Sequence, residues 1–212
     1  MSQSPIPTLV VMARWPASGR CKRRLGVDIG SEKAAIIQQR LTAHTFAVVE
    51  ALTKRADVDV QVAMSGVSLR SAQRSLTSLP PCTLVDQGRG SLGARMLRQI
   101  HRARFGQRHK PVILIGTDLA DLCQNDLLQA IQRLQNHPMV LGPSADGGYW
   151  LLGLGPALTR LQLDALFAAM PWGTNKVLDI TCARAHGLGL IPHRLSRKND
   201  IDCLADLSAW QR

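Results

Sequence analysis

The segment Leu9–Gly26, LVVMARWPASGRCKRRLG, decides the fold of this chain. Its apolar run Leu9–Met12 predicts a buried strand, and Pro16 excludes a helix directly after it. The loop that follows carries a glycine and five cations: Arg14, Gly19, Arg20, Lys22, Arg23 and Arg24. Two interpretations fit a buried strand that ends in such a loop. The loop is a solvated basic surface, or it holds a polyanion.

Strand and helix patterns alternate over the rest of the chain. We expect strands at 9–12, 58–64, 83–85, 112–115, 139–141, 149–154 and 188–192. We expect helices at 32–54, 92–105, 125–135, 174–186 and 202–210, with N-caps at Ser31, Thr174 and Asp202, and a short helix within 65–78. Such alternation indicates one α/β domain, residues 1–212 with a core of about 8–208, built on a mostly parallel sheet with helices on both faces.

Composition narrows the class of protein. The chain has 212 residues and a net charge of +11, an excess that attracts nucleic acid, anionic membrane or phosphorylated small molecules. The five cysteines are scattered and never spaced as C-x-x-C, which favours a reducing, cytoplasmic location. We expect no membrane span and no secretory signal.

Aspartates follow the ends of the expected strands. Asp118 comes directly after the apolar run 112–115, at the sheet edge where ligands bind in α/β proteins, and could hold a divalent ion. The alternative is that Asp118 or Asp121 caps the helix that follows. We prefer the metal site for Asp118 and the helix cap for Asp121. Asp146 lies in the turn SADGG, with Gly147 and Gly148, where a hairpin turn and a site are equally compatible. In an extended segment Asp200 and Asp202 face one side, and one of them could complete a metal site.

Glycines and cations suggest where a phosphate would bind. Gly19 allows close backbone approach, while Lys22 and Arg24 could clamp phosphates, although the P-loop pattern is absent. The segment QGRGSLGARM places Gly93 and Arg95 at a helix start, which suits an anion. Farther down that helix we expect Arg98, Arg102 and Arg104 to form a solvated face.

One tryptophan is a further candidate. In PWGTNK, Trp172 and Thr174 are explained by a core ring and a helix cap, but an exposed ring could stack on a sugar or base.

In order, these motifs resemble the bacterial GT-A-type proteins of domain-of-unknown-function family 2064, nucleotide-diphospho-sugar transferase-like glycosyltransferases linked in part to arsenosugar biosynthesis. The resemblance runs from about Leu9 to Leu207. It is carried by Arg14-x-Pro16-x-x-Gly19-x-x-Lys22-x-Arg24-Leu25, Leu92-Gly93-Ala94-Arg95-Met96, Ile115-Gly116-Thr117-Asp118, Gly142-Pro143-x-x-Asp146-Gly147-Gly148-Tyr149, Trp172-Gly173-Thr174 and Asp200-Ile201-Asp202. The chain departs from the family pattern at Arg14, Arg23, Leu119-Ala120 and Cys203-Leu204-Ala205. None of these departures removes Asp118, Asp146 or Asp202.

The resemblance implies a GT-A fold and a transferase using a nucleoside diphosphate sugar and a small-molecule acceptor. It implies that Arg14, Lys22 and Arg24 contact the diphosphate, with Gly19, Gly93 and Arg95 in the nucleotide site. Mg²⁺ or Mn²⁺ would bind Asp118 and Asp202, and Asp146 would be a candidate base. Gly147, Gly148, Trp172 and Thr174 would lie on the substrate side.

Three other functions stay open. A nucleotidyltransferase would use an NTP and release pyrophosphate from the same site. A non-catalytic nucleotide sensor would keep only the phosphate site. A nucleic-acid-binding protein is disfavoured, because the chain has four Trp, one Tyr and three Phe and no basic-aromatic stacking motif. The oligomeric state stays open.

Overall fold

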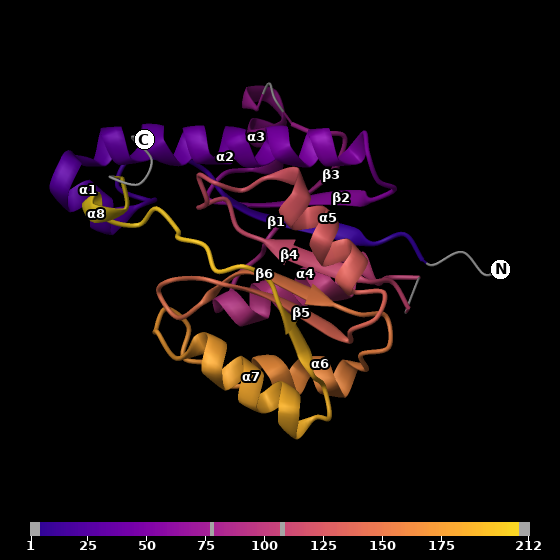
Figure 1. Cartoon of the computed structure of the whole chain (residues 1–212). Coiled ribbons are helices and arrows are strands. Elements are labelled where there is room, and N and C mark those ends of the chain that lie inside the picture. Colours follow the sequence, from indigo (N-terminus) through magenta and orange to yellow (C-terminus); the bar gives the residue numbers. More distant parts are fainter. Residues whose placement is uncertain (1–4, 77–78, 107–108, 208–212) are drawn as a thin grey trace.

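The computed structural model describes residues 5–76, 79–106 and 109–207 (Figure 1). A seven-stranded sheet in the order β3-β2-β1-β4-β6-β5-β7 forms its centre. The strands are β1 (Thr8–Arg14), β2 (Asp59–Ser65), β3 (Thr83–Asp86), β4 (Val112–Ile115), β5 (Met139–Pro143), β6 (Tyr149–Leu154) and β7 (Pro192–Arg194). The helices are α1 (Arg23–Ile29), α2 (Ser31–Thr53), α3 (Leu69–Ser75), α4 (Leu92–Ala103), α5 (Gln124–Arg133), α6 (Arg160–Phe167), α7 (Val177–Gly187) and α8 (Leu204–Leu207).

The sheet is parallel except at β6, which pairs antiparallel with both β4 and β5. The mostly parallel sheet with helices on both faces is confirmed. All four residues of β4 are apolar and buried, as expected for a central strand covered on both sides. At the edge of the sheet formed by β7, strands β5 and β7 pair in parallel, with Met139 opposite Pro192.

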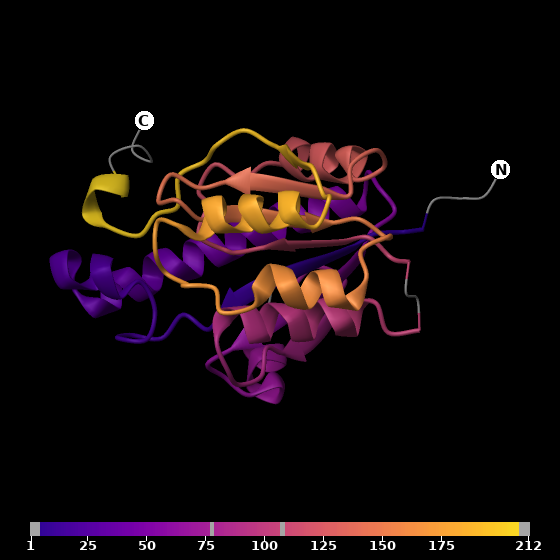
Figure 2. The same ribbon diagram turned by 90° about the horizontal axis from the view of Figure 1, so that it is seen from below.

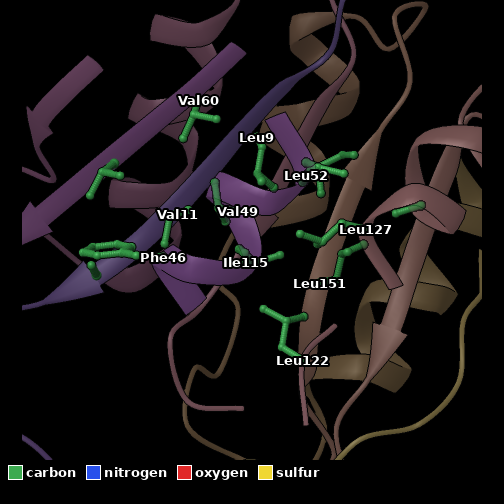
Figure 3. Packing of buried hydrophobic residues seen from close by; sticks show 14 of the residues in the cluster. Leu9, Val11, Phe46, Val49, Leu52, Val60, Ile115, Leu122, Leu127 and Leu151 are labelled. Atoms are coloured by element: carbon green, nitrogen blue, oxygen red, sulfur yellow. The ribbon is translucent and has the colours of Figure 1, made fainter. Parts of the chain in front are cut away.

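Alternate residues of the strands pack into two apolar layers. On one face, Val11 and Ile115 meet Phe46 and Val49 of α2 and Leu127 of α5 (Figure 3). The other face is covered by α4, α6 and α7, whose buried residues include Ile100, Leu163 and Ala185. Seen from below, α6 and α7 lie in front of the sheet (Figure 2). None of the helices in the described ranges is long and apolar enough to cross a lipid bilayer.

After β7 the chain runs past the ends of β5 and β4 to helix α1 (Figure 1). We call residues 195–203 the C-terminal strap. The strap forms two isolated bridges, Ser144↔Lys198 just after β5 and Leu119↔Asp200 on the segment after β4. It ends at α8, which contacts α1 (Figure 1).

Several local expectations are wrong. Helices α1 and α6 were not expected. The last strand was expected at 188–192 but runs over Pro192–Arg194, because α7 continues to Gly187. The N-cap of α5 is Cys123 and not Asp121, whose carboxylate pairs with Lys198. The N-caps of α2 and α7 are Gly30 and Lys176 in place of Ser31 and Thr174.

The expected solvated face of α4 is also wrong at Arg104. Its side chain is buried, and its guanidinium donates to the carbonyls of Lys110, Leu154, Gly155 and Leu158. Lys110 precedes β4, Leu154 ends β6, and Gly155 and Leu158 lie on the connection from β6 to α6.

Candidate functional site

A pocket of about 420 Å³ opens at the carboxyl ends of the parallel strands. Its charged residues come from the end of β1, the loop before α1, α4, the segment after β4, the β5–β6 turn and the strap. Residues of α2 and of the α6–α7 connection also line it. Its lining includes Arg14, Lys22, Gln38, Gln87, Arg95, Asp118, Asp146, Trp172, Asp200 and Asp202. Both signs of charge therefore meet in one concave site.

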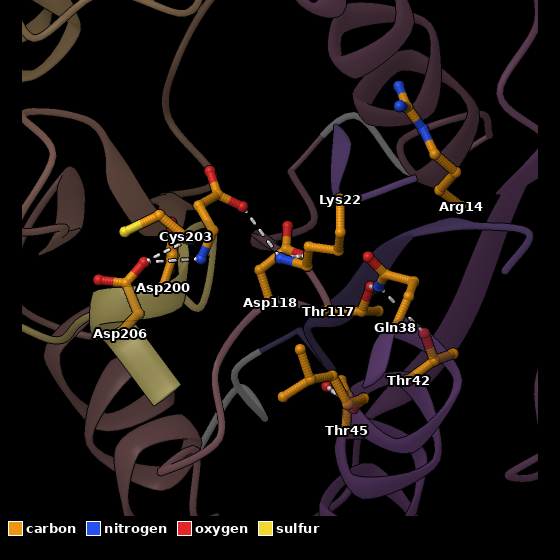
Figure 4. Close-up of polar contacts among 12 residues, drawn as sticks. Arg14, Lys22, Gln38, Thr42, Thr45, Thr117, Asp118, Asp200, Cys203 and Asp206 are labelled. Atoms are coloured by element: carbon orange, nitrogen blue, oxygen red, sulfur yellow. Dashed lines mark hydrogen bonds and ion pairs between the residues drawn. The ribbon is translucent and has the colours of Figure 1, made fainter. Parts of the chain in front are cut away.

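Lys22 is the centre of the acidic part of the pocket (Figure 4). Its Nζ lies 2.5 Å from Asp118 Oδ1 and 3.1 Å from Asp202 Oδ1, while its side chain is only 2% exposed. Burial by itself would lower the pKa of Lys22, but the carboxylates of Asp118 and Asp202 outweigh burial and raise it. The ammonium thus joins the segment after β4 to the C-terminal strap.

The backbone of Lys22 has an unusual conformation. Its φ is 44° and its ψ is 49°, in the left-handed region, and it is the N-cap of α1. An L-residue other than Gly, Asn or Asp adopts this region at a cost of about 1–2 kcal/mol. The backbone change ends the basic loop and starts α1, while the side chain contacts both carboxylates.

Two further aspartates join this cluster. Asp200 lies on the strap, where Ser144 Oγ donates to its carboxylate at 3.4 Å. Burial, and then the charges of Asp118, Asp146 and Asp202, raise the pKa of Asp200 to about 7. Asp146 is exposed and accepts from the Gly148 N–H at 2.9 Å. Asp200 thus lies close to Asp118, Asp146 and Asp202, and two of these, Asp118 and Asp202, pair with the buried ammonium of Lys22.

Backbone hydrogen bonds hold the strap against the sheet edge. The Ile201 N–H donates to the Asp118 carbonyl at 3.0 Å, and Lys198 exchanges backbone hydrogen bonds with Pro143 and Ala145. The Asp206 carboxylate accepts from the Asp202 and Cys203 N–H groups at 2.8 Å each. The position of Asp202 is therefore set on both sides.

A separate basic part of the pocket lies where β1, β2 and β3 end. Arg95 donates from Nη1 to Gln87 Oε1 at 3.1 Å. Gln87 in turn donates to the carbonyls of Ala13 and Ala63 at 2.9 and 3.0 Å. Burial first, and then the neighbouring charges of Arg14 and Arg98, lower the pKa of Arg95.

The sequence offered no signal for two buried glutamines in the lining. Gln38, inside α2, donates to Thr117 Oγ1 at 3.1 Å, and both side chains are buried. Gln87 follows β3, and its buried amide orients Arg95. Each was an ordinary polar residue in its segment, and only the fold brings it to the strand ends.

Trp172 and its neighbours close the side of the pocket near α4 and α7. The Trp172 ring lies 6.0 Å from the Phe167 ring and so close to Gly93 that a Cβ there would stand 2.8 Å from the indole. Thr174 and Gly148 also line the pocket. Gly147 does not, because it packs directly against the backbone of Asn175.

The structure brings most of the expected residues together. Arg14, Lys22, Arg95, Asp118, Asp146, Gly148, Trp172, Thr174 and Asp202 all line the pocket. Gly19, Arg24, Gly93 and Gly147 are not part of its lining. Gly19 and Arg24 are exposed, so the basic loop contributes Lys22 to the pocket, and Arg14 enters from the strand end before it.

The donor set of the acidic part fits a hard divalent cation. Mg²⁺ and Mn²⁺ prefer carboxylate oxygens, and the side chains of Asp118 and Asp202 are 43% and 48% exposed, so they are accessible to an ion. Among the described residues, no three His, Cys, Asp or Glu side chains are arranged so as to hold an ion on their own. Phosphate oxygens and water would therefore have to complete the coordination, as is usual for Mg²⁺.

Comparisons with solved structures show where this fold recurs. A candidate nucleotide-diphospho-sugar transferase from Desulfovibrio desulfuricans G20 superposes with a TM-score of 0.82 and 25% identity, over 97% of this chain and 86% of that chain. The 4-diphosphocytidyl-2C-methyl-D-erythritol synthase of Anaerococcus prevotii DSM 20548 gives 0.60 and 9%, over 99% and 100%. The glucosyl-3-phosphoglycerate synthase of Mycobacterium tuberculosis, solved with Mn²⁺ and UDP, gives 0.55 and 12%, over 92% and 71%.

The fold is thus the GT-A-like fold of nucleotide-sugar transferases and nucleotidyltransferases. A search of curated protein sequences returned no match. A family model described as "uncharacterized protein conserved in bacteria (DUF2064)" matches residues 48–174, well over half of the chain. The chain belongs to this bacterial family, DUF2064.

Proposed function

We propose that this protein is a metal-assisted glycosyltransferase that takes its sugar from a nucleoside diphosphate sugar. One observation carries the proposal: Lys22 bridges Asp118 and Asp202 inside a pocket that also holds Arg14 and Arg95. An anionic diphosphate needs cations, and a divalent ion on that diphosphate needs carboxylates. Both requirements are met within one pocket at the ligand-binding edge of an α/β sheet.

Asp118 and Asp202 would hold Mg²⁺ or Mn²⁺, which when bound neutralises the charge of a leaving diphosphate. Lys22 keeps the two carboxylates in place and is the buried cation nearest to them. Its ammonium has three donor hydrogens, so it can also donate to a phosphate oxygen. Arg14 adds a second cation at the same sheet edge, whereas the exposed Arg24 is left out of the proposed site.

Asp146 is the candidate base for the acceptor hydroxyl. It is exposed, it lines the pocket, and the Gly148 N–H holds one of its oxygens. Trp172 and Thr174, on the connection between α6 and α7, also line the pocket and offer a ring face and a hydroxyl to a sugar. The acceptor is a small molecule, since the pocket measures only about 420 Å³.

Nucleotidyl transfer is the second candidate, because the cations that suit a diphosphate suit a triphosphate equally. Incubation with each NTP and each nucleoside diphosphate sugar separates the two reactions. Glycosyl transfer or donor hydrolysis releases a nucleoside diphosphate, and nucleotidyl transfer releases pyrophosphate. Pyrophosphate as the product would replace the first proposal by the second.

The metal site is tested by Asp118→Ala. We expect calorimetric titration with a nucleoside diphosphate to show Mg²⁺-dependent binding by the wild type and its loss in the variant. Asp121→Ala is the matched control, because Asp121 lies three residues later, pairs with Lys198 and does not line the pocket. Metal-dependent binding that is the same in Asp118→Ala and wild type would remove Asp118 from the site.

A further inference from the structure

The basic part of the pocket contains a buried donor that no protein group satisfies. Arg95 Nε is buried and has no hydrogen-bond partner within the described residues. A buried donor without a partner costs about 1–3 kcal/mol, and more in a charged group. Because Arg95 lines the pocket, a ligand there is the natural partner for its guanidinium.

Arg95 is held in its orientation by a saturated neighbour. Gln87 uses its amide hydrogens on the Ala13 and Ala63 carbonyls, at the ends of β1 and β2, and its oxygen on Arg95. The Gln87 side chain is buried and has no free donor for a ligand. Its effect is to fix one edge of the Arg95 guanidinium against the sheet, which is how a preorganised binding group is built.

The charge around Arg95 is not compensated by carboxylates. Arg14 and Arg98 are near enough to lower the pKa of Arg95. Within the described ranges, none of the three forms a salt bridge; their recorded hydrogen bonds go to carbonyls and to Gln87. Three guanidinium groups without a carboxylate partner thus gather beside the pocket, whereas Lys22 forms salt bridges with Asp118 and Asp202.

We propose that Arg95 and Arg14, with Arg95 braced by Gln87, form a subsite that binds a phosphate group without a metal ion. The subsite lies at the ends of β1–β3, whereas Asp118 and Asp202 lie on the segment after β4 and on the strap. Figure 4 shows Arg14 pointing away from the contacts that Lys22 makes with the aspartates. The pocket thus has two anion-recognising regions, one using guanidinium groups and one using carboxylates with a metal.

A phosphate explains the arrangement better than a neutral nucleobase does. Arginine binds a planar acceptor pair such as guanine O6 and N7, but a neutral base would leave the repulsion among Arg14, Arg95 and Arg98 unrelieved. A phosphate supplies negative charge together with several acceptor oxygens, and matches the guanidinium fork. The uncompensated positive charge of the three arginines therefore favours a phosphate over a neutral base as the ligand.

This inference deepens the proposed function and rests on it for the origin of the phosphate, which belongs either to the nucleotide donor or to a phosphorylated acceptor. The experiment therefore begins with inorganic pyrophosphate in the presence of EDTA, which needs no transferase activity. We expect calorimetry to show binding by the wild type and at least about tenfold weaker binding by Arg95→Gln.

Arg14→Gln is the second variant, since Arg14 is exposed and its replacement should not disturb folding. Arg102→Gln is the matched control: it lies on α4, is exposed, and is outside the pocket lining. We expect Asp118→Ala to bind metal-free pyrophosphate at least as well as the wild type, which separates this subsite from the metal site.

The two sources of phosphate give different results in the same variants. If the donor supplies the phosphate, Arg95→Gln also weakens nucleoside diphosphate binding in Mg²⁺ by a similar factor. If the acceptor supplies it, the protein saturated with nucleoside diphosphate and Mg²⁺ still binds inorganic phosphate through Arg95. The inference is overturned if Arg95→Gln binds pyrophosphate as the wild type does, or if its defect appears with guanosine and not with phosphate.

Discussion

Lys22 illustrates how one residue can join loop, helix and site. Its left-handed backbone ends the basic loop and starts α1, and its buried ammonium bridges Asp118 and Asp202. The two carboxylates are about half exposed, so solvent screens part of the interaction. Removal of the ammonium nevertheless leaves Asp118, Asp200 and Asp202 without their nearest counter-charge.

We therefore expect Lys22→Met to lower the free energy of unfolding in EDTA by about 2 kcal/mol, less than the value for a fully buried pair. Added Mg²⁺ should raise the Tm of Lys22→Met more than that of the wild type, because the ion replaces the missing positive charge. Differential scanning fluorimetry with and without Mg²⁺ measures both effects. An equal response to Mg²⁺ in the two proteins would contradict this account of the acidic cluster.

Gly147 is a structural residue of the β5–β6 turn rather than a part of the pocket lining. Its φ is 86°, its carbonyl accepts from the Leu178 N–H at 2.9 Å, and a Cβ would collide with the Asn175 backbone. Gly147→Ala should cost about 3 kcal/mol, from the collision and the left-handed backbone together.

Gly19→Ala is the matched control, because Gly19 has a φ of 70° with open space around the missing Cβ. It should cost only the backbone strain, about 1 kcal/mol. Urea denaturation of both variants separates strain from collision. Equal losses in the two variants would mean that the contact with Asn175 contributes nothing.

At this scale the sequence could indicate residue types but not partners. Asp118 was readable because an acid directly after a central strand must lie at the sheet edge. The pairing of Lys22 with Asp202 was not readable, because 180 positions separate them. Arg24 looked as suitable as Lys22 in the sequence, yet it is exposed on α1 and outside the pocket lining.

Among the elements, α4 depends on the buried guanidinium at its C-terminal end. Arg104 is only 8% exposed and donates to four carbonyls, at 2.7–3.4 Å. It therefore joins the end of α4 to the segment before β4 and to the β6–α6 connection.

We expect Arg104→Met to destabilise the protein by about 3 kcal/mol, since several buried carbonyls lose their donor at once. Arg104→Lys should recover little, because an ammonium cannot reach acceptors spread along a guanidinium plane. Arg102→Met, exposed on the same helix, should change stability by less than about 0.5 kcal/mol. Chemical denaturation measures all three, and near-wild-type stability of Arg104→Met would show that water replaces the guanidinium.

Elements with strong apolar patterns were predictable, and elements fixed by local backbone chemistry were not. The strands β4 and β6 begin and end where their apolar runs do. Helix α6 was missed although Thr159 and Gln162 form a capping box that is legible in the sequence. Helix α1 was missed because its start depends on the left-handed Lys22 rather than on a conventional cap.

For the whole molecule, the order of motifs along the chain was enough to predict the fold through the family resemblance. Several of these motifs follow parallel strands, whose carboxyl ends share one edge of the sheet. The reversed direction of β6 was only hinted at by the Asp146-Gly147 turn. The site as a whole was predicted as a meeting of cations and aspartates. Its division into an acidic and a basic part was not, because that depends on Gln87 and on the path of the strap.

The gathering of carboxylates makes stability depend on pH. Folding raises the pKa of Asp200 from about 3.8 to about 7, so the folded protein holds this proton more tightly than the unfolded chain does. The contribution of Asp200 to stability is therefore present at low pH and is lost as the pH rises from about 4 through 7.

In EDTA, urea denaturation should show that Asp200 lowers the free energy of unfolding by about 1–2 kcal/mol as the pH rises from about 5.5 to 8. This value is reduced to allow for the remaining contact of the carboxyl group with solvent. Asp200→Asn should be the more stable protein at about pH 8 and should have the flatter pH profile. A variant with the same pH profile as the wild type would show that Asp200 titrates normally.

The C-terminal strap has a consequence for how the protein is made. A ribosome releases the segment that carries Lys22 long before it releases the one that carries Asp202, so a nascent chain can complete the sheet up to β6 while its acidic cluster still lacks two members. If the proposed function holds, the metal-binding part of the pocket is completed only when the strap has emerged, and a fragment that stops short of the strap should keep much of the architecture without that part.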